Sequence, residues 1–236
     1  MNLTLPPSLA GKITDLSIYF DKQPIISNFS VNLKKNQIHV LTGTSGSGKT
    51  TLLRAFNRLN DCFENSHAKG EITLSLDGKS LAVNTLKTHQ LPNLRRKVGM
   101  VFQHPQLLPG TVIDNLLLPL KVVNHVSGEH AHAQAVSALQ QAALWEDVKD
   151  RLSRPANTLS GGQQQRLCLA RTLALEPEIL LLDEPTASLD PDTTDQIEAL
   201  IRQLAAQYTI VMVSHSAQQT QKLADQVIHL EQGRWV

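Results

Sequence analysis

The chain has 236 residues, enough for one large domain, or a core with an inserted subdomain, around a real hydrophobic core. Its 22 basic and 21 acidic residues leave a formal net charge of +1, which gives no electrostatic footprint for nucleic acid or an anionic membrane. No apolar stretch reaches the roughly 18 residues that span a bilayer, and no secretory signal pattern opens the chain. If the protein works at a membrane, another chain supplies the spanning helices.

The two cysteines and a group of histidines give no sign of a metal site or a disulfide framework. Cys62 and Cys168 lack metal-ligand spacing, and Cys168 lies among apolar residues. We therefore predict that Cys168 is a small buried apolar residue in a reduced, cytosolic compartment. His125, His130 and His132 fall in a polar stretch, and we expect them to be solvated rather than to bind a metal.

The first half of the chain contains several predicted strands and one helix. The apolar run Ile38–Thr42 is typical of a short buried strand, and apolar residues then recur at helical spacing between Leu52 and Leu59. Apolar and polar residues alternate over Glu71–Leu76, which predicts an antiparallel strand. Val98–Phe102 predicts a further strand that ends at Gln103.

The second half changes character before it returns to strands. Residues 104–174 are rich in leucine, alanine and glutamine, and their pattern is mostly helical, which predicts an inserted helical subdomain. Ile179–Leu182 is a continuous apolar run, typical of a strand buried on both faces. A helix over Pro191–Gln207 and strands over Tyr208–Ser214 and Val227–Leu230 complete an α/β pattern.

A glycine-rich segment lies between the first predicted strand and its helix, which is the context that a phosphate-binding loop requires. Its residues are Gly43, Thr44, Ser45, Gly46, Ser47, Gly48, Lys49 and Thr50. Glycines let successive backbone N–H groups approach a triphosphate, Lys49 supplies a charge to the terminal phosphates, and the Thr50 hydroxyl is a ligand for Mg²⁺. A chance glycine-rich linker would not match this full spacing between strand and helix.

Two adjacent carboxylates, Asp183 and Glu184, follow the apolar strand Ile179–Leu182 and precede Pro185. Plain solvated charge is the alternative interpretation, but the position at the end of a buried strand favours a functional pair. We expect Asp183 to face the metal and Glu184 to polarise the attacking water. In phosphoryl transfer the protein contributes mainly positioning and charge stabilisation, so further contacts to the γ-phosphate are expected.

The segment Leu159–Gln163 is the most specific signal in the chain. Ser160 is a good N-cap for a helix, and the N–H groups that follow it, together with the helix dipole, make an anion site. With the phosphate loop before it and the acidic pair after it, the chain resembles an ATP-binding-cassette (ABC) ATPase from about Ile13 to Gly233. An ordinary glycine-containing turn would not explain this order of motifs.

The resemblance implies an α/β fold: a P-loop NTPase (RecA-like) core with an antiparallel β subdomain, over residues 1–103 and 175–236, and a helical signature subdomain over residues 104–174. It also implies ATP and Mg²⁺ as cofactors. By the same resemblance, Gln103 contacts the metal and the water, and His215 contacts the γ-phosphate. Phe20 is the expected adenine-stacking residue, with Tyr19 as the neighbour that could substitute. The remaining implied nucleotide contacts are Thr51, Ser160, Gly161, Gly162, Gln163 and Asp190.

The implied partners are integral membrane permease subunits, a second copy of the chain, and a substrate-binding protein, but no nucleic acid. The implied location is peripheral, at the cytoplasmic face of the cell membrane. Leu53–Asp61, Arg95–Gln103 and Gly161–Arg171 further resemble the ATPase subunit of phosphate importers, so inorganic phosphate is the leading cargo. Leu107–Asp114 and Thr186–Ser188 depart from that pattern, which leaves open an importer or exporter of metal, amino acid or lipid. A soluble ABC ATPase would carry paired cassettes or long coiled-coil insertions, and a metabolic kinase would lack the signature.

Two consequences concern surfaces. The run that contains Leu107, Leu108, Val112, Ile113, Leu116 and Leu117 holds more apolar residues than one helical face would bury. Core packing explains at least half of them, and we expect some of the others to meet a short helix of the membrane subunit. The second consequence is a head-to-tail pair, in which the Lys49 loop of one chain and the Ser160 helix of the other hold each ATP.

Overall fold

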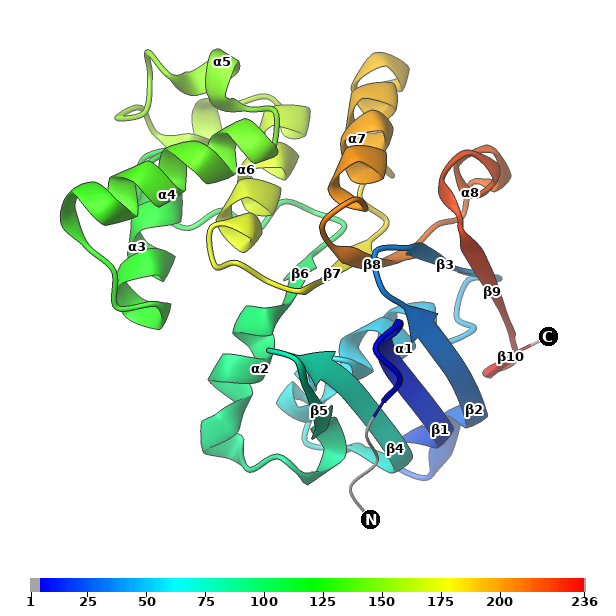
Figure 1. Ribbon diagram of the computed structural model, residues 1–236. Coiled ribbons are helices and arrows are strands. Elements are labelled where there is room, and N and C mark those ends of the chain that lie inside the picture. The colour runs from blue at the N-terminus through cyan, green and yellow to red at the C-terminus, as the bar shows by residue number, and fades with distance from the viewer. Residues whose placement is uncertain (1–4, 236) are drawn as a thin grey trace.

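The computed structural model describes residues 5–235, which form two β-sheets and eight α-helices (Figure 1). The larger sheet has six strands in the order β10-β9-β3-β8-β7-β6, and all its neighbours are parallel except β10 and β9. Its strands are β3 (Ile38–Gly43), β6 (Val98–Val101), β7 (Ile179–Asp183), β8 (Thr209–Val213), β9 (Gln226–Glu231) and β10 (Arg234–Trp235).

Strands β7 and β8 lie in the middle of this sheet and are buried along their whole length. Helices cover both faces of such a sheet, so uninterrupted apolar runs form its strands without alternation. The strands predicted at Ile38–Thr42, Val98–Phe102, Ile179–Leu182, Tyr208–Ser214 and Val227–Leu230 are confirmed, with ends that differ by at most one residue.

The second sheet is antiparallel, with the order β2-β1-β4-β5. Its strands are β1 (Leu9–Phe20), β2 (Gln23–Lys34), β4 (Ser66–Leu76) and β5 (Lys79–Ala82). The strand predicted at Glu71–Leu76 is confirmed as the second half of β4. The pattern did not predict β1 and β2, because Asp15 (φ 50°) and Asn28 (φ 49°) adopt left-handed backbone conformations inside them. The pairing register of β1 and β2 shifts nearby, which breaks the period of two.

A group of helices lies to one side of the sheets, as Figure 1 shows in green to yellow. It consists of α3 (Asp114–Val123), α4 (Gly128–Gln141), α5 (Trp145–Val148) and α6 (Gly161–Leu173). Their apolar faces share one hydrophobic cluster with strands of the parallel sheet, and Cys168 is buried in it as predicted. The helical character predicted for residues 104–174 is confirmed from Asp114 onward, whereas the segment before it is irregular. Residues 1–4 and 236, which the sequence assigned to the nucleotide-binding core, lie outside the described residues.

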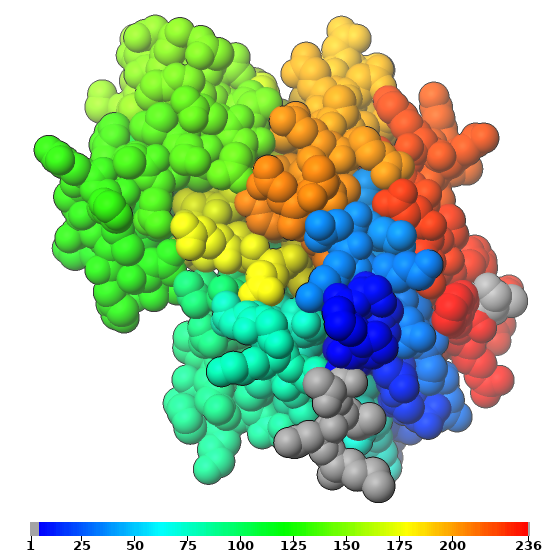
Figure 2. Space-filling view, in the orientation of Figure 1, coloured from blue at the N-terminus to red at the C-terminus, as the bar shows by residue number. Residues whose placement is uncertain are grey.

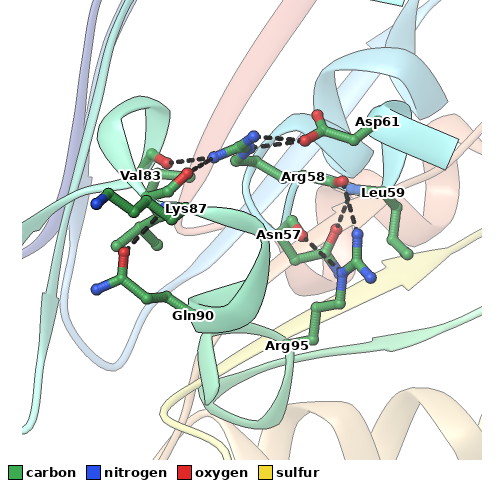
Figure 3. A network of polar contacts seen from close by, with 9 residues as sticks. Asn57, Arg58, Leu59, Asp61, Val83, Lys87, Gln90 and Arg95 are labelled. Carbon is green, nitrogen blue, oxygen red and sulfur yellow. Dashed lines mark hydrogen bonds and ion pairs between the residues drawn. The ribbon is translucent and has the colours of Figure 1, made fainter. Parts of the chain in front are cut away.

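The remaining helices are α1 (Lys49–Ala55), α2 (Leu91–Lys97), α7 (Pro191–Leu204) and α8 (Ala217–Leu223). A polar network ties the end of α1 to α2 and to the segment before it (Figure 3). The Arg58 guanidinium donates to the Val83 and Leu86 carbonyls and pairs with Asp61, and Arg95 donates to the carbonyls of Asn57 and Arg58. The segment after α1 is therefore held against α2 and the residues before it.

The apolar run expected to dock a membrane subunit is mostly part of the core. Val112 and Leu116 are fully buried, and the other four side chains of the run are half-buried. The large apolar side chains that the structure exposes nearby lie further along α3: Leu118 at 49%, Val122 at 62% and Val123 at 38%. Five of the six residues belong to the core or pack against it, in line with the expectation that core packing explains at least half of the run, and the docking of the half-buried side chains to a membrane subunit stays a prediction. In Figure 2 this group of helices forms the green part of the surface.

Within residues 5–235, no helix combines the length and the apolar character that crossing a bilayer requires. His125, His130 and His132 are exposed, as predicted.

Candidate nucleotide site

The glycine-rich loop connects β3 to α1 and has the backbone that its glycines permit. Gly43 has φ 137°, and a Cβ there would lie 2.1 Å from the Leu230 carbonyl oxygen. Gly48 has φ 96° and lies just before the first residue of α1. No other residue type fits at Gly43 without moving β9, so glycine there is required by close packing as well as by φ.

Lys49 lies inside the curve of this loop, with its side chain only 5% exposed. Its ammonium donates to the carbonyl oxygens of Gly43 (2.9 Å) and Thr44 (2.7 Å). Burial lowers the pKa of Lys49, while the carboxylates of Glu184 and Asp183 oppose that shift. The loop thus holds a largely desolvated cation where backbone N–H groups converge, which is an arrangement suited to a polyphosphate.

Asp183 is the last residue of β7 and is buried. Its Oδ1 accepts a hydrogen bond of 2.9 Å from the Thr50 hydroxyl at the start of α1. Burial raises the pKa of Asp183, and the Thr50 hydrogen bond and the charges of Arg54 and Lys49 partly offset the shift. A hydroxyl oxygen and a carboxylate therefore meet near the Lys49 ammonium, and their role as metal ligands stays a prediction.

Glu184 joins two further predicted residues. Its Oε1 lies 2.9 Å from His215 Nε2, and its Oε2 accepts a hydrogen bond of 3.4 Å from Gln103 Nε2. Gln103, Glu184 and His215 follow β6, β7 and β8, which are adjacent parallel strands. The carboxyl ends of parallel strands share one edge of the sheet, where α/β proteins bind their ligands. Glu184 itself has φ 47°, a strained backbone at a predicted reactive position.

The segment Leu159–Gln163, called the signature segment below, begins α6 as predicted, with Ser160 as the N-cap. The Ser160 hydroxyl accepts from the Gln163 N–H, and the Gln163 side chain accepts from the Ser160 N–H, which completes a capping box. Ser160 and Gly161 are exposed, and a Cβ at Gly161 would meet no atom of residues 5–235 within 4 Å. Gly162 is different, because a Cβ there would lie 2.4 Å from Thr193 on α7.

Asp190, Thr51 and Phe20 have local partners. Asp190 caps α7, where its carboxylate accepts from the N–H and hydroxyl of Thr193. Phe20 is half-buried and makes an edge contact with Phe63, at 5.7 Å between ring centroids. Thr51 lies on α1, and its carbonyl accepts from the Asn60 amide. The contacts of Asp190 and Phe20 are made by their side chains and that of Thr51 by its backbone, and none of these contacts joins them to the Glu184 cluster.

Tyr19, named as the alternative to Phe20, is occupied elsewhere. Its ring stacks on His67, with the centroids 4.9 Å apart.

Sequence reasoning missed Arg54, which lies one turn after Thr50 on α1. Arg54 lines a cavity of about 380 Å³ together with Gln103 and Asp183. Its position four residues after a phosphate-loop residue is a helical spacing that pattern analysis could have used. The structure also reveals buried Gln219, for which the pattern offers no signal.

Comparisons with known proteins decide the family. A family described as ABC transporter matches residues 26–187. The chain belongs to the ABC transporter family. This ABC ATPase is 42% identical over 98% of its length to a phosphate import ATP-binding protein PstB of Colwellia psychrerythraea, of which it covers 81%. It is 44% identical over 94% of its length to phosphate import ATP-binding protein PstB 1 of Yersinia pestis, of which it covers 80%.

Solved structures agree on the fold. The ABC ATPase superposes on cbiO1 of Clostridium perfringens, part of the transporter complex cbiONQ, with a TM-score of 0.81, 26% identity and coverage of 97% of this chain and 87% of that one. It superposes on the ATP-binding cassette MJ0796, solved as a dimer in a post-hydrolysis state with ADP and Pi, with a TM-score of 0.77, 31% identity and coverage of 95% and 96%. The predicted fold class, ATP binding and ATPase activity are thereby confirmed.

Proposed function

We propose that this chain is the ATP-hydrolysing subunit of a phosphate importer. The observation that carries the proposal is the identity of 39–44% to proteins named phosphate import ATP-binding proteins over 94–98% of the chain. The Leu53–Asp61 segment also resembles phosphate importers in sequence, and its Arg58 donates to the Val83 and Leu86 carbonyls before α2 (Figure 3). Partners in this proposal are membrane permease subunits and a phosphate-binding protein, with the chain peripheral at the cytoplasmic face.

The proposed chemistry assigns Glu184 to the water. A water beside the Glu184 carboxylate attacks the γ-phosphorus, the bond from that phosphorus to the β,γ-bridging oxygen breaks, and ADP leaves with the bonding electrons. Glu184 orients the water and accepts one of its protons as the new P–O bond forms, and the other proton stays on the phosphate that is released. Lys49 and His215 place positive charge and N–H donors where negative charge develops on the γ-phosphate oxygens.

The donor set near Asp183 fits Mg²⁺. The Thr50 hydroxyl and the Asp183 carboxylate are 2.9 Å apart, and the Gln103 amide lines the same cavity as Asp183. Oxygen donors of this kind suit a small hard cation that keeps several waters and shares phosphate oxygens. A bound Mg²⁺ supplies neutralisation of charge on the β- and γ-phosphate oxygens. Within residues 5–235 no group of three His, Cys, Asp or Glu side chains forms a complete metal cage, which suits a metal that arrives with ATP.

The nucleotide contacts of the proposal extend from the loop to more distant residues. Phe20 would stack on adenine after rotation away from Phe63, and Thr51 would contact the α-phosphate side of the loop. The signature residues Ser160, Gly161, Gly162 and Gln163, with Asp190, would contact the ATP bound to a second copy. The open space above Gly161 supports this assignment, because a helix start with free approach can receive a phosphate group.

The second copy completes the proposed machine. Two chains arranged head to tail would hold two ATP molecules between the loop of one and the α6 start of the other. ATP binding at a hundredfold excess over its dissociation constant favours a bound state by about 2.7 kcal/mol per site. Hydrolysis removes the shared γ-phosphate contact, so the pair opens and the change passes to the permease.

The docking surface for the permease is the second interface of the proposal. We place it on the irregular segment after Gln103 and the exposed apolar residues of α3. The half-buried Leu107 and Leu108 and the exposed Leu118 lie along this path. Charge substitutions at Leu107 and Leu108 would weaken co-purification with the membrane subunits while leaving the domain folded.

A phosphate uptake measurement tests the proposed cargo. Cells of the source organism that lack the chain should lose high-affinity uptake of radiolabelled phosphate. Wild-type chain should restore it, and Glu184→Gln, expressed at the same level, should not. Uptake that survives the loss of the chain, with a defect in metal, amino-acid or lipid transport instead, would overturn phosphate as the cargo and keep the ATPase mechanism.

A further inference from the structure

A buried polar side chain outside the predicted motifs links the loop that carries Glu184 to the helix that follows His215. Gln219, on α8, is 4% exposed. Its amide nitrogen donates to the Thr186 hydroxyl (2.8 Å) and to a carboxylate oxygen of Glu198 on α7 (3.1 Å). Three elements that are distant in sequence therefore meet at one amide group.

The loop on one side of this amide carries the catalytic carboxylate. Thr186 lies two residues after Glu184, and the turn that follows is held by hydrogen bonds from the Ala187 N–H to the Glu184 carbonyl and from the Leu189 N–H to the Thr186 carbonyl. The Thr186 hydroxyl is the side-chain group through which Gln219 holds this turn. The position of the turn that carries Glu184 therefore depends on α8.

The helix on the other side follows His215 directly. Ser216 caps α8 through the Gln219 N–H, so His215 lies one turn before Gln219. His215 Nε2 is 2.9 Å from Glu184 Oε1, and the two backbones that carry these side chains are joined again at Gln219. A close contact between His215 Nε2 and Glu184 Oε1 at the site and the Gln219–Thr186 hydrogen bond behind it hold one loop against the other.

Glu198, the carboxylate that accepts from Gln219, is also buried and forms an ion pair. Glu198 is 6% exposed, and Lys222 lies 2.8 Å from its Oε2. Lys222 also pairs with Asp195, and these contacts raise the pKa of Lys222 to about 12. The amide of Gln219 thus has a fixed anionic acceptor, which orients its N–H groups toward Thr186.

We propose that Gln219 is a positioning residue for ATP hydrolysis, which holds the Glu184 loop against the helix that follows His215. The inference rests on the proposed roles of Glu184 and His215. Loss of this tie would leave the phosphate loop intact, because the Gln219 amide donates to Thr186 and Glu198 and not to that loop, and would misplace the water-binding carboxylate. The defect should therefore appear in turnover and spare ATP binding.

The first test is Gln219→Leu, which keeps the volume and removes both hydrogen bonds. We expect kcat for ATP to fall about tenfold while KM for ATP stays within about twofold. The matched control is Gln218→Leu, at the exposed neighbouring position of the same helix, which should keep the wild-type kcat. A fall in thermal stability with an unchanged kcat would show that Gln219 is only a structural residue and would overturn the proposal.

The second test exchanges the two interacting groups. Gln219→Glu places a carboxylate against Glu198 and should lower kcat at least as much as Gln219→Leu. The double variant Gln219→Glu/Glu198→Gln restores an amide–carboxylate pair with reversed direction, and the Thr186 hydroxyl then donates to the new carboxylate. We expect kcat to return to within about threefold of wild type. A double variant as slow as Gln219→Glu would contradict the proposal, and this comparison also decides the matter if Gln219→Leu does not fold.

Glu184→Gln is measured in parallel to distinguish a failure of the role proposed for Glu184 from a failure of the role proposed for Gln219. If Glu184→Gln hydrolyses ATP at the wild-type rate, the proposed role of Glu184 fails and the inference fails with it. If Glu184→Gln is inactive and both Gln219 variants keep the wild-type kcat, only the inference about Gln219 fails.

Discussion

The phosphate loop and the helix start at Ser160 differ in the partners that each finds within one chain of this ABC ATPase. The phosphate loop encloses a buried Lys49 whose ammonium already has two carbonyl partners, and Asp183 and Glu184 lie beside it. The helix start at Ser160 is exposed, and its cap is satisfied within its own segment.

This difference bears on the mechanism. A desolvated cation beside two carboxylates forms one side of a reaction site, and binding energy at that side is available to a single chain. An exposed helix start offers N–H groups and a dipole but holds no reactive group of its own. In the proposed mechanism the two segments therefore have separate tasks: one binds and reacts, and the other senses a phosphate brought by another molecule.

The largest expected effect separates binding from turnover on the phosphate-loop side. Glu184→Gln should lower kcat about a thousandfold and leave the affinity for ATP within about threefold, because it removes the charge at the water and keeps the loop. Lys49→Ala is the contrasting control and should weaken both binding and turnover. ATP affinity by equilibrium dialysis and turnover by phosphate release measure the two quantities. Wild-type turnover in Glu184→Gln would show that another group positions the water.

A smaller effect is expected from the signature side. Ser160→Arg should lower turnover about a hundredfold, since a bulky cation blocks the helix start that senses the phosphate. ATP binding to the single chain at low protein concentration should stay unchanged, because Ser160 lies outside the loop that binds it. Thermal melting with and without ATP, next to the turnover measurement, distinguishes the two. If Ser160→Arg weakens ATP binding to the single chain, the segments are not separate.

The smallest effect concerns the stability of the reactive side. Burial raises the pKa of Asp183 above its unfolded value, so the folded state disfavours the charged carboxylate. The resulting loss of stability is fully present above the folded pKa, shrinks as pH falls through it, and disappears below the unfolded value. Without nucleotide, Asp183→Asn should thus be more stable than wild type at neutral pH, with an advantage that fades on acidification. Urea unfolding across this pH range checks the sign, and an advantage that grows on acidification would contradict it.

Sequence reasoning recovered the features whose pattern is local. Strand β7 is an uninterrupted apolar run, and the phosphate loop has fixed spacing, so each could be found without knowing its neighbours. Strands β1 and β2 were missed because Asp15 and Asn28 interrupt their alternation. Such irregular positions depend on how β1 and β2 pair with each other, and the pattern of one strand alone does not reveal them.

The site shows the same division. Glu184 was predicted from its place after a buried strand, and Gln103 and His215 from the resemblance to the ABC family; the parallel sheet brings all three together. The contact of Gln219 with Glu198 joins α8 to α7, and no spacing in one sequence marks it. A pairing of that kind is set by tertiary packing, which a single sequence does not display.

The composite site is the central claim, and mixed dimers of differently tagged chains test it most directly. A Lys49→Ala chain paired with a Ser160→Arg chain should keep one intact site, because both defects fall in the same pocket. A double-mutant chain paired with wild type should keep none, because each pocket then carries one defect. The account therefore predicts about half of the wild-type ATPase activity for the first pair, and residual activity for the second. The reversed pattern, an inactive first pair and a half-active second pair, would show that each chain builds its site alone and would contradict the account.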